Sequence, residues 1–203
     1  EFGVVMPLKA EVVRRQAAAE LEALPGYANL VIGDLLSEVH HLDQRIKQYD
    51  AHVRAMAREC TAAQRLMQLM GVGETTATAI VAMVGNGAEF DIGRQFAVWI
   101  GLVPGQYSSG GKARLGRITK RGDAYLRTLL ILGAKSALQA ALRKPPEGRH
   151  RLQQWMVTVF SRIGYHKTLV AIANKHARII WALLVKGEDF DVQRLTPKVV
   201  AVA

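Results

Sequence analysis

LMQLMGVGETTATAIVAMVG (residues 66–85) predicts two short helices joined by a tight turn at Gly71-Val72-Gly73. Gly71 and Gly73 permit positive φ angles and a close approach of another backbone. The free N–H groups at the start of the second helix can face a phosphate, helped by the helix dipole. This is the pattern of a helix-hairpin-helix, which binds the backbone of duplex nucleic acid without reading its sequence. A plain packed corner between two helices has the same pattern, so both interpretations stay open.

Upstream of this motif, residues 28–58 predict one long helix with a coiled-coil seam. Its apolar positions alternate spacings of four and three residues. They are Leu35, Val39, Leu42, Ile46, Tyr49, Val53 and Met56. Either this helix packs on its own domain, or the seam pairs with another helix and sets the assembly of a homo-oligomer, a dimer or a tetramer. An earlier helix over 7–24 stops at Pro25-Gly26, and residues 1–62 together are interpreted as a helical linker.

Downstream, the apolar periodicity predicts helices over 93–100, 123–142, 150–162 and 166–186. Phe96 and Trp99 face inward from the first of these, and Asp123 is the N-cap or first-turn acid of the second. A short ribbon within 103–119 is the one candidate for strand. The predicted fold class is therefore all-α. A long coiled-coil-like helix precedes a helical domain, residues 63–191, that contains the helix-hairpin-helix, and residues 192–203 form a tail without pattern.

The positive charge of the chain is concentrated in one segment. Twelve Lys and Arg residues lie between Arg94 and Arg151 against only Asp123 and Glu147, and the formal net charge of the whole chain is +10. A charge so confined is typical of a surface that binds a polyanion such as nucleic acid. Its centre is the Gly-rich loop over 106–121. The predicted nucleic-acid-binding cations in and beside this loop are Lys112, Arg114, Arg117, Lys120, Arg121 and Arg127.

Composition bounds the remaining possibilities. The single cysteine, Cys60, excludes an internal disulfide and fits a reducing cytoplasm. No apolar run of about 18 residues is present, which argues against a membrane partner. His40, His41 and His52 lack a carboxylate or thiolate to complete a ligand set, so no metal site is expected. The chain begins at Glu1 without an initiator methionine and is expected to be part of a longer protein.

The basic loop contains the candidate nucleophiles, Ser108 and Ser109, followed by Gly110-Gly111. Such a string is commonly a plain turn. Its setting among guanidinium and ammonium groups favours a second interpretation. Those cations can bind a scissile phosphate, stabilise the charge that develops in phosphoryl transfer, and lower the pKa of a nearby hydroxyl. Paired carboxylates for two metal ions are missing, which argues against a metal-dependent nuclease contained wholly in this chain.

A long stretch carries a resemblance to a known family. The string GVGETTATAIVAMVGNGAEFDIGRQFAVWIGLVPGQYSSGGKARLGRITKRGDAYLRTLLILGAKSAL (residues 71–138) resembles the C-terminal domain of DEDD-type insertion-sequence transposases. These form the IS one-ten and IS eleven-eleven groups and are relatives of the pilin-gene inverting DNA recombinases. The similarity continues through Lys167, which joins the predicted nucleic-acid-binding set, and through AIANKHARIIWALL to about Asp191. The helix before Cys60 resembles the coiled-coil linker of the family.

The resemblance implies a DNA transposase or recombinase. The helical domain of the family supplies a catalytic serine, which falls on Ser109 here, with Ser108 as the fallback, and this serine forms a covalent phosphoserine link to DNA. A structured bridge RNA guides the exchange, and dimers or tetramers build composite sites. The full proteins also carry an N-terminal RuvC-like domain with metal-binding acids, where Mg²⁺ is expected. That domain is absent from this sequence, so the chain alone is expected to be inactive.

Two other functions compete with this interpretation. A non-catalytic helix-hairpin-helix module would bind nucleic acid with the serines as mere turn residues. A structural rod would use the long helix for oligomerisation, with the basic patch as a solvated face. The bacterial cytoplasm, in association with the nucleoid, is the expected location for a protein that binds DNA.

Overall fold

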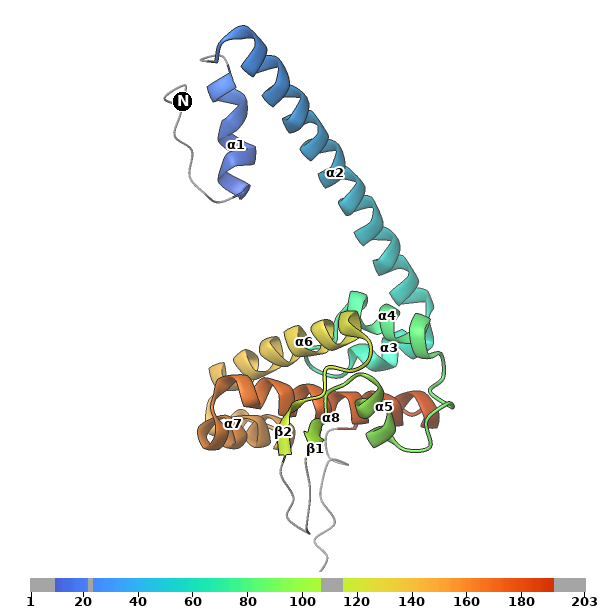
Figure 1. Ribbon diagram of the computed structural model, residues 1–203. Helices are drawn as coiled ribbons and strands as arrows, with labels where there is room; N and C mark the ends of the chain where they lie inside the picture. The colour runs from blue at the N-terminus through green and yellow to red at the C-terminus, as the bar shows by residue number, and fades with distance from the viewer. Residues whose placement is uncertain (1–9, 22–23, 107–114, 192–203) are drawn as a thin grey trace, which may run out of the picture. The chain divides into compact units, whose positions relative to one another are not determined.

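A computed structural model of the chain describes residues 10–21, 24–106 and 115–191 (Figure 1). The described residues are mostly helical, with one short two-stranded hairpin, which confirms the predicted all-α class. They divide into two compact units, residues 1–52 and 53–203. The long helix predicted over 28–58 is confirmed as α2 (Gly26–Glu59), whose residues are divided between the two units.

The first unit pairs α1 (Ala10–Glu20) with the greater part of α2. The chain turns at Pro25, whose carbonyl accepts a hydrogen bond from the N–H of Ala28 at 2.9 Å. Further along, Arg14 and Asp43 form an ion pair of 3.1 Å between the two helices. Of the helix predicted over 7–24, the structure assigns Ala10–Glu20 to α1, while residues 7–9 and 22–23 lie outside the described residues.

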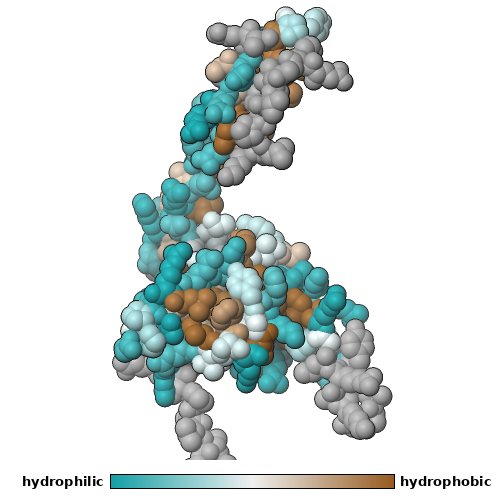
Figure 2. All heavy atoms as spheres, turned by 90° about the vertical axis from the view of Figure 1, so that its left-hand side faces the viewer, coloured by the Kyte–Doolittle hydropathy of each residue, from teal (hydrophilic) through white to brown (hydrophobic). Residues whose placement is uncertain are grey.

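α1 covers only part of the predicted seam of α2 within this unit, at Val39. The groove between the two helices is lined on the α2 side by Leu36, Val39 and Asp43. Seam residues Leu35 and Ile46 lie on the surface instead, with 61% and 56% of their accessible area exposed. Figure 2 likewise shows hydrophobic side chains at the surface among hydrophilic ones in this part of the chain. Much of the predicted seam is therefore exposed in this unit.

The second unit consists of the end of α2 and a set of shorter helices around one core. In chain order they are α3 (Thr61–Met67), α4 (Glu74–Val84), α5 (Gly93–Trp99), the strands β1 (Pro104–Gln106) and β2 (Leu115–Ile118), α6 (Ala124–Arg143), the 3₁₀ turn η2 (Pro146–Gly148), α7 (Arg151–Ile163) and α8 (Tyr165–Lys186). α8 is the central helix and packs against α3, α5, α6 and α7. Figure 1 shows α6, α7 and α8 running beside one another.

Alanines allow α6 and α8 to approach closely. Ala134, Ala137 and Ala141 of α6 and Ala173 and Ala177 of α8 are fully buried in one apolar cluster. Small side chains at such positions bring the helix axes together and leave room for larger neighbours, which keeps the core densely packed. The large side chains of this core include Leu66, Phe96, Leu130 and Met156.

Local signals in the sequence set the helix ends. The Asp123 side chain accepts a hydrogen bond from the N–H of Leu126 at 2.6 Å, so the predicted N-cap of α6 is confirmed. His150 caps α7 in the same way, with its Nδ1 accepting from the N–H of Gln153 at 3.3 Å. Burial, and then the charge of Lys144, lower the pKa of His150. That shift favours the neutral ring, the form that can accept this bond.

The prediction that Phe96 and Trp99 both face inward is wrong in part. Phe96 is fully buried as expected, but Trp99 is 38% exposed. α5 has only seven residues, and Trp99 is its last. Its indole lies against the rings of Phe90 and Phe96, with centroids 5.7 and 6.1 Å apart, and so covers the core from outside.

α8 is long and apolar enough to cross a membrane by length and composition alone. Half of its most apolar window is buried inside the second unit, however, and its buried residues belong to the common core. This is the pattern of a core helix, for which the same composition is needed.

Candidate nucleic-acid interface

The predicted ribbon within 103–119 is confirmed as a hairpin of β1 and β2. The strands are antiparallel, with Pro104 opposite Ile118 and Gln106 opposite Leu115. Two further backbone hydrogen bonds extend the pairing toward the core, from the N–H of Thr119 to Val103 at 2.9 Å and from the N–H of Lys120 to Gly101 at 3.2 Å. The Ser-Gly element connects the two strands in the sequence. Ser108, Ser109, Lys112 and Arg114 therefore lie outside the described residues.

Two glycines anchor the base of this hairpin. Gly101 has φ +78°, and a Cβ there would overlap the carbonyl oxygen of Arg121. Gly122 has φ +117°, and a Cβ there would overlap the carbonyl oxygen of Trp99. The two ends of the segment thus cross at backbone contact distance where α5 ends and α6 begins. No other residue permits both the positive φ and this approach.

The hairpin base is also tied to the core by side chains. Leu102 is fully buried, and its carbonyl accepts a hydrogen bond from Nδ2 of Asn174 in α8 at 3.2 Å. Arg127 of α6 donates through a guanidinium nitrogen to the carbonyls of Ile100, at 2.9 Å, and of Asp123, at 3.5 Å. These bonds make the partly buried Arg127 a brace of the hairpin base. Its contact with nucleic acid stays a prediction.

Three predicted cations lie at the described part of the hairpin and its base. Arg117, Lys120 and Arg121 are all exposed. Lys120 adopts φ +53°, an unusual conformation for a residue with a side chain. Residues held in this region are concentrated at functional sites, because the surrounding structure must offset their strain. The anchored backbone around Lys120 supplies that constraint.

The two short helices predicted over 66–85 are present as α3 and α4, joined through Gly71-Val72-Gly73. Gly71 has φ +91°, and a Cβ there would overlap the carbonyl oxygen of Gly133 in α6. Gly71 is therefore used for packing. Gly73, the N-cap of α4, is exposed, and a Cβ there would meet open space. A phosphate contact at Gly73 remains a prediction, and the adjacent carboxylate of Glu74 would oppose it.

Lys167 is exposed on the first turn of α8, an element separate from the hairpin. A second set of cations lines a pocket beside α5 and α8. The sequence did not predict that these residues lie together. They are Arg94, Lys175, Arg178 and Lys186. Three of them lie on α8 and Arg94 on α5, so only the packing of these two helices brings them together. Among the residues that the structure describes, no group of three or more His, Cys, Asp or Glu side chains is placed to hold a metal ion.

Comparison with known proteins identifies the family to which this chain is similar. Residues 63–153 match the model of the transposase IS116/IS110/IS902 family. A probable family 20 transposase of Pseudomonas aeruginosa is 38% identical over 91% of this chain and 55% of its own length. The transposase for insertion sequence element IS1111A of Coxiella burnetii is 38% identical over 94% of this chain and 52% of its own. The transposase for IS1328 of Yersinia enterocolitica is 33% identical over 94% and 56%.

The chain thus spans about half the length of the curated relatives it matches. The resemblance noted from the GVGETTATAIVAMVG string onward is confirmed, and the matched residues include both the α3–α4 turn and the anchored hairpin. The chain therefore belongs to the IS116/IS110/IS902 family of transposases.

Proposed function

We propose that this chain holds DNA against the β1–β2 hairpin during transposition of an insertion sequence, with Ser109 as the nucleophile of strand cleavage. The observation that carries the proposal is the crossing of Gly101 and Gly122. That crossing fixes the two ends of the Ser-Gly segment on the core, beside the exposed Arg117, Lys120 and Arg121. A reacting group must be positioned accurately, and a loop on a rigid base meets that need better than a free one.

In the proposed reaction, the Oγ of Ser109 attacks a backbone phosphorus and the bond to one bridging oxygen breaks. The released strand end takes the proton as a hydroxyl, while the other end stays esterified to the serine. The cations around the loop would stabilise the negative charge that increases on the phosphate oxygens. Ser108 is the alternative nucleophile. Mg²⁺ would be held by a RuvC-like domain outside the described residues, which contain no suitable carboxylate cluster.

Two partners are part of the proposal. A structured guide RNA would choose the DNA strands, as expected from the family resemblance. A second copy of the chain would pair with the exposed seam of α2, which includes Leu35 and Ile46. In such an assembly the serine of one subunit can meet the metal-binding domain of another.

Binding of a labelled DNA duplex to the chain tests the surface. The double variant Arg117→Gln/Arg121→Gln is expected to weaken binding about five- to tenfold at low salt, because two phosphate contacts are lost. Arg162→Gln on α7 is the control for loss of an exposed arginine elsewhere. Equal, small effects of the two variants would contradict the proposed surface.

The second candidate function is a helix-hairpin-helix module without catalysis. It is favoured by the open space at Gly73, where the first turn of α4 is accessible. In that case Gly73→Val should reduce duplex binding more than the hairpin variant does, because a branched side chain would block approach to the N–H groups of α4.

A further inference from the structure

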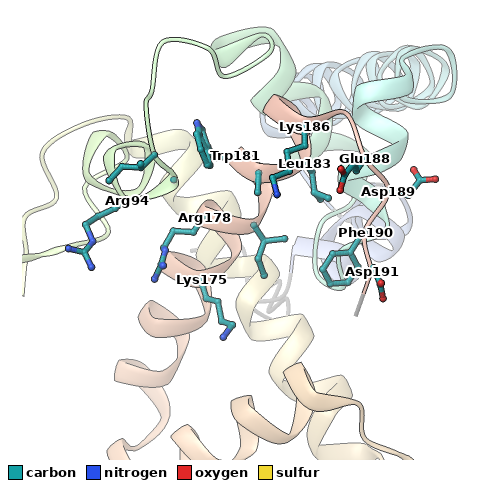
Figure 3. A pocket seen from close by; sticks show the side chains of 14 residues that line it. Arg94, Lys175, Arg178, Trp181, Leu183, Lys186, Glu188, Asp189, Phe190 and Asp191 are labelled. Atoms are coloured by element: carbon teal, nitrogen blue, oxygen red, sulfur yellow. The ribbon is translucent and has the colours of Figure 1, made fainter. Parts of the chain in front are cut away.

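A pocket separate from the hairpin opens beside α5 and α8 (Figure 3). Its volume is about 620 Å³, which is in the range of small-ligand sites. The residues after α8, from Glu188 to Asp191, form one of its walls. None of its lining residues belongs to the segment 101–122, so the proposed DNA surface does not account for it.

Opposite charges face each other across this pocket. Figure 3 shows Arg94, Lys175 and Arg178 on one side, and the carboxylates of Glu188, Asp189 and Asp191 toward the other. Lys175 and Arg178 are three residues apart on α8 and so lie on neighbouring turns. Burial, and then the nearby charge of Arg178, lower the pKa of Lys175. An anion bound between these cations would relieve their repulsion.

Backbone packing holds the cationic side in place. Gly93, the first residue of α5, is pressed against α8, and a Cβ there would lie 3.0 Å from the carbonyl oxygen of Arg178. The backbone at Arg94 is thereby held next to α8. Trp181, which lines the pocket between the two arginines and the segment after α8, donates its indole N–H to the carbonyl of Phe90 at 3.0 Å.

The side chain of Gln68 helps to hold the opposite wall. Gln68 accepts a hydrogen bond from the N–H of Phe190 at 2.7 Å and donates one to Oδ1 of Asp189 at 3.0 Å. Phe190 also packs against the core. Both walls are therefore formed before any ligand arrives, and pre-formed sites lose less free energy to ordering on binding.

The lining between the charged walls is mainly apolar and includes Ile179, Trp181 and Phe190. A concave apolar surface with cations at one side suits a flat base whose phosphate stays outside. We propose that this pocket takes one unpaired nucleotide of a DNA strand. Its phosphate would lie at Arg94, Lys175 and Arg178, and its base against Ile179 and Phe190. This proposal rests on the proposed function only in requiring that DNA be brought to the chain.

The test uses the whole chain and three labelled duplexes of equal length. One is fully paired, one carries a single bulged adenosine, and one carries an abasic residue in the bulge. The unchanged chain is expected to bind the bulged duplex about tenfold more tightly than the paired one, with the abasic duplex between them. The double variant Arg94→Gln/Arg178→Gln should abolish the preference, while Arg162→Gln should keep it. Both substituted arginines are exposed, and circular dichroism checks the fold.

Persistence of the preference in the double variant, or its equal loss in Arg162→Gln, would overturn the pocket assignment. Should the double variant fail to fold, Arg94→Gln alone measures the same preference. Displacement of the bulged probe by an equimolar free adenosine monophosphate would also overturn it, because the pocket would then select a free nucleotide over a strand.

The hairpin variant Arg117→Gln/Arg121→Gln separates this proposal from the proposed function. It should weaken all three duplexes by a similar factor and leave the preference intact. If that variant is neutral while the pocket variant abolishes the preference, the hairpin surface fails alone. If the pocket variant is neutral while the hairpin variant weakens binding, the pocket fails alone. Failure of the unchanged chain to bind any duplex at low salt would overturn both.

Discussion

His176 links the stability of the core to pH. Its side chain is fully buried in α8, and neither ring nitrogen has a hydrogen-bond partner among the described residues. Burial, and then the charge of Lys175, lower its pKa to about 4. In the unfolded chain the ring takes up a proton near pH 6.5, whereas the folded chain resists this until about pH 4. The free energy of unfolding should therefore be constant above about pH 7 and fall as the pH decreases through that window.

Because of His176, the free energy of unfolding should be roughly 2–3 kcal/mol lower at pH 4.5 than at pH 7.5. Urea denaturation at the two pH values measures the change. His176→Leu removes the titrating group. The difference in pH dependence between wild type and variant therefore separates the contribution of His176 from those of the carboxylates and the other histidines. A variant with the same pH dependence as the unchanged chain would refute the assignment.

Ser109 is expected to be the residue that becomes covalently bound to DNA. For this measurement the chain is fused to a RuvC-like domain of the kind proposed to hold Mg²⁺ and is incubated with Mg²⁺ and labelled substrate. Ser109→Ala should lower the yield of the adduct on a denaturing gel by orders of magnitude while binding persists. Ser136→Ala, an exposed serine of α6, is the control. Adduct formation that survives both Ser109→Ala and Ser108→Ala would exclude these serines.

At this scale the sequence predicts residue types better than their partners. The cluster of Arg and Lys near the loop was evident, yet Arg127 could not be recognised as a brace. Its partner is the carbonyl of Ile100, 27 positions earlier in the chain, and backbone carbonyls carry no sequence signal. The exposure of Trp99 was missed for a similar reason, because it depends on where a seven-residue helix ends over the core.

Among the elements, the α3–α4 turn and α6 are held together by a contact between two glycines. A Cβ on Gly133 would overlap the carbonyl oxygen of Gly71, just as one on Gly71 would overlap that of Gly133. Gly133→Ala should therefore lower the free energy of unfolding by about 2–3 kcal/mol or more, even though alanine favours helix. Gly73→Ala, in the same turn but facing open space, should cost about 1 kcal/mol or less. Thermal or urea denaturation compares them, and equal losses would contradict the packing role.

The seam of α2 gives the second prediction about an element. Leu42→Lys and Ile46→Lys should each raise the dissociation constant of the oligomer more than tenfold, because a buried charge in a coiled-coil core is strongly unfavourable. His41→Lys changes a neighbouring position off the seam and should leave assembly intact. Analytical ultracentrifugation distinguishes these outcomes. A monomeric unchanged chain would show that the exposed seam has another purpose.

Helix positions were predicted well where a side chain marks the end. Asp123 marked the start of α6, and Pro145-Pro146 marked the limit of its C-terminal side, where the structure has Arg143 as the last helical residue. The short hairpin was only a candidate, because its strands have three and four residues and lack a clear alternation. Its existence depends on the glycine crossing beneath it, which is a tertiary contact.

For the molecule as a whole, charge gives the clearest expectation. Replacing Arg117, Lys120 and Arg121 together by Gln should decrease the slope of log affinity against log salt by about 3 for duplex DNA. A control variant that removes the same charge through Arg143, Arg151 and Arg162 should change the slope much less. Titrations at several salt concentrations give both slopes. Equal changes would mean that net charge, and not the hairpin, controls binding.

The balance of charge along the chain also explains why the sequence did not predict the pocket beside α5 and α8. Outside the segment from Arg94 to Arg151 the basic and acidic residues are equal in number, so the charge count did not single out Lys175, Arg178 or Lys186 of α8 or the residues after it. In space, Lys175, Arg178 and Lys186 join Arg94, and Glu188, Asp189 and Asp191 lie across the pocket from most of them. A count of charges along the sequence gives a net value near zero here, although the fold places most of the cations and the carboxylates on different sides of the pocket.

The meeting of Gly101 with Arg121 and of Gly122 with Trp99 has a practical consequence for engineering. These contacts fix the base of the hairpin whatever peptide connects the two strands. The connecting peptide can therefore change in length without disturbing the packing of the helices. A short affinity tag inserted after Gly110 should leave the melting temperature nearly unaltered, whereas a single methyl group added at either clamp should lower it sharply.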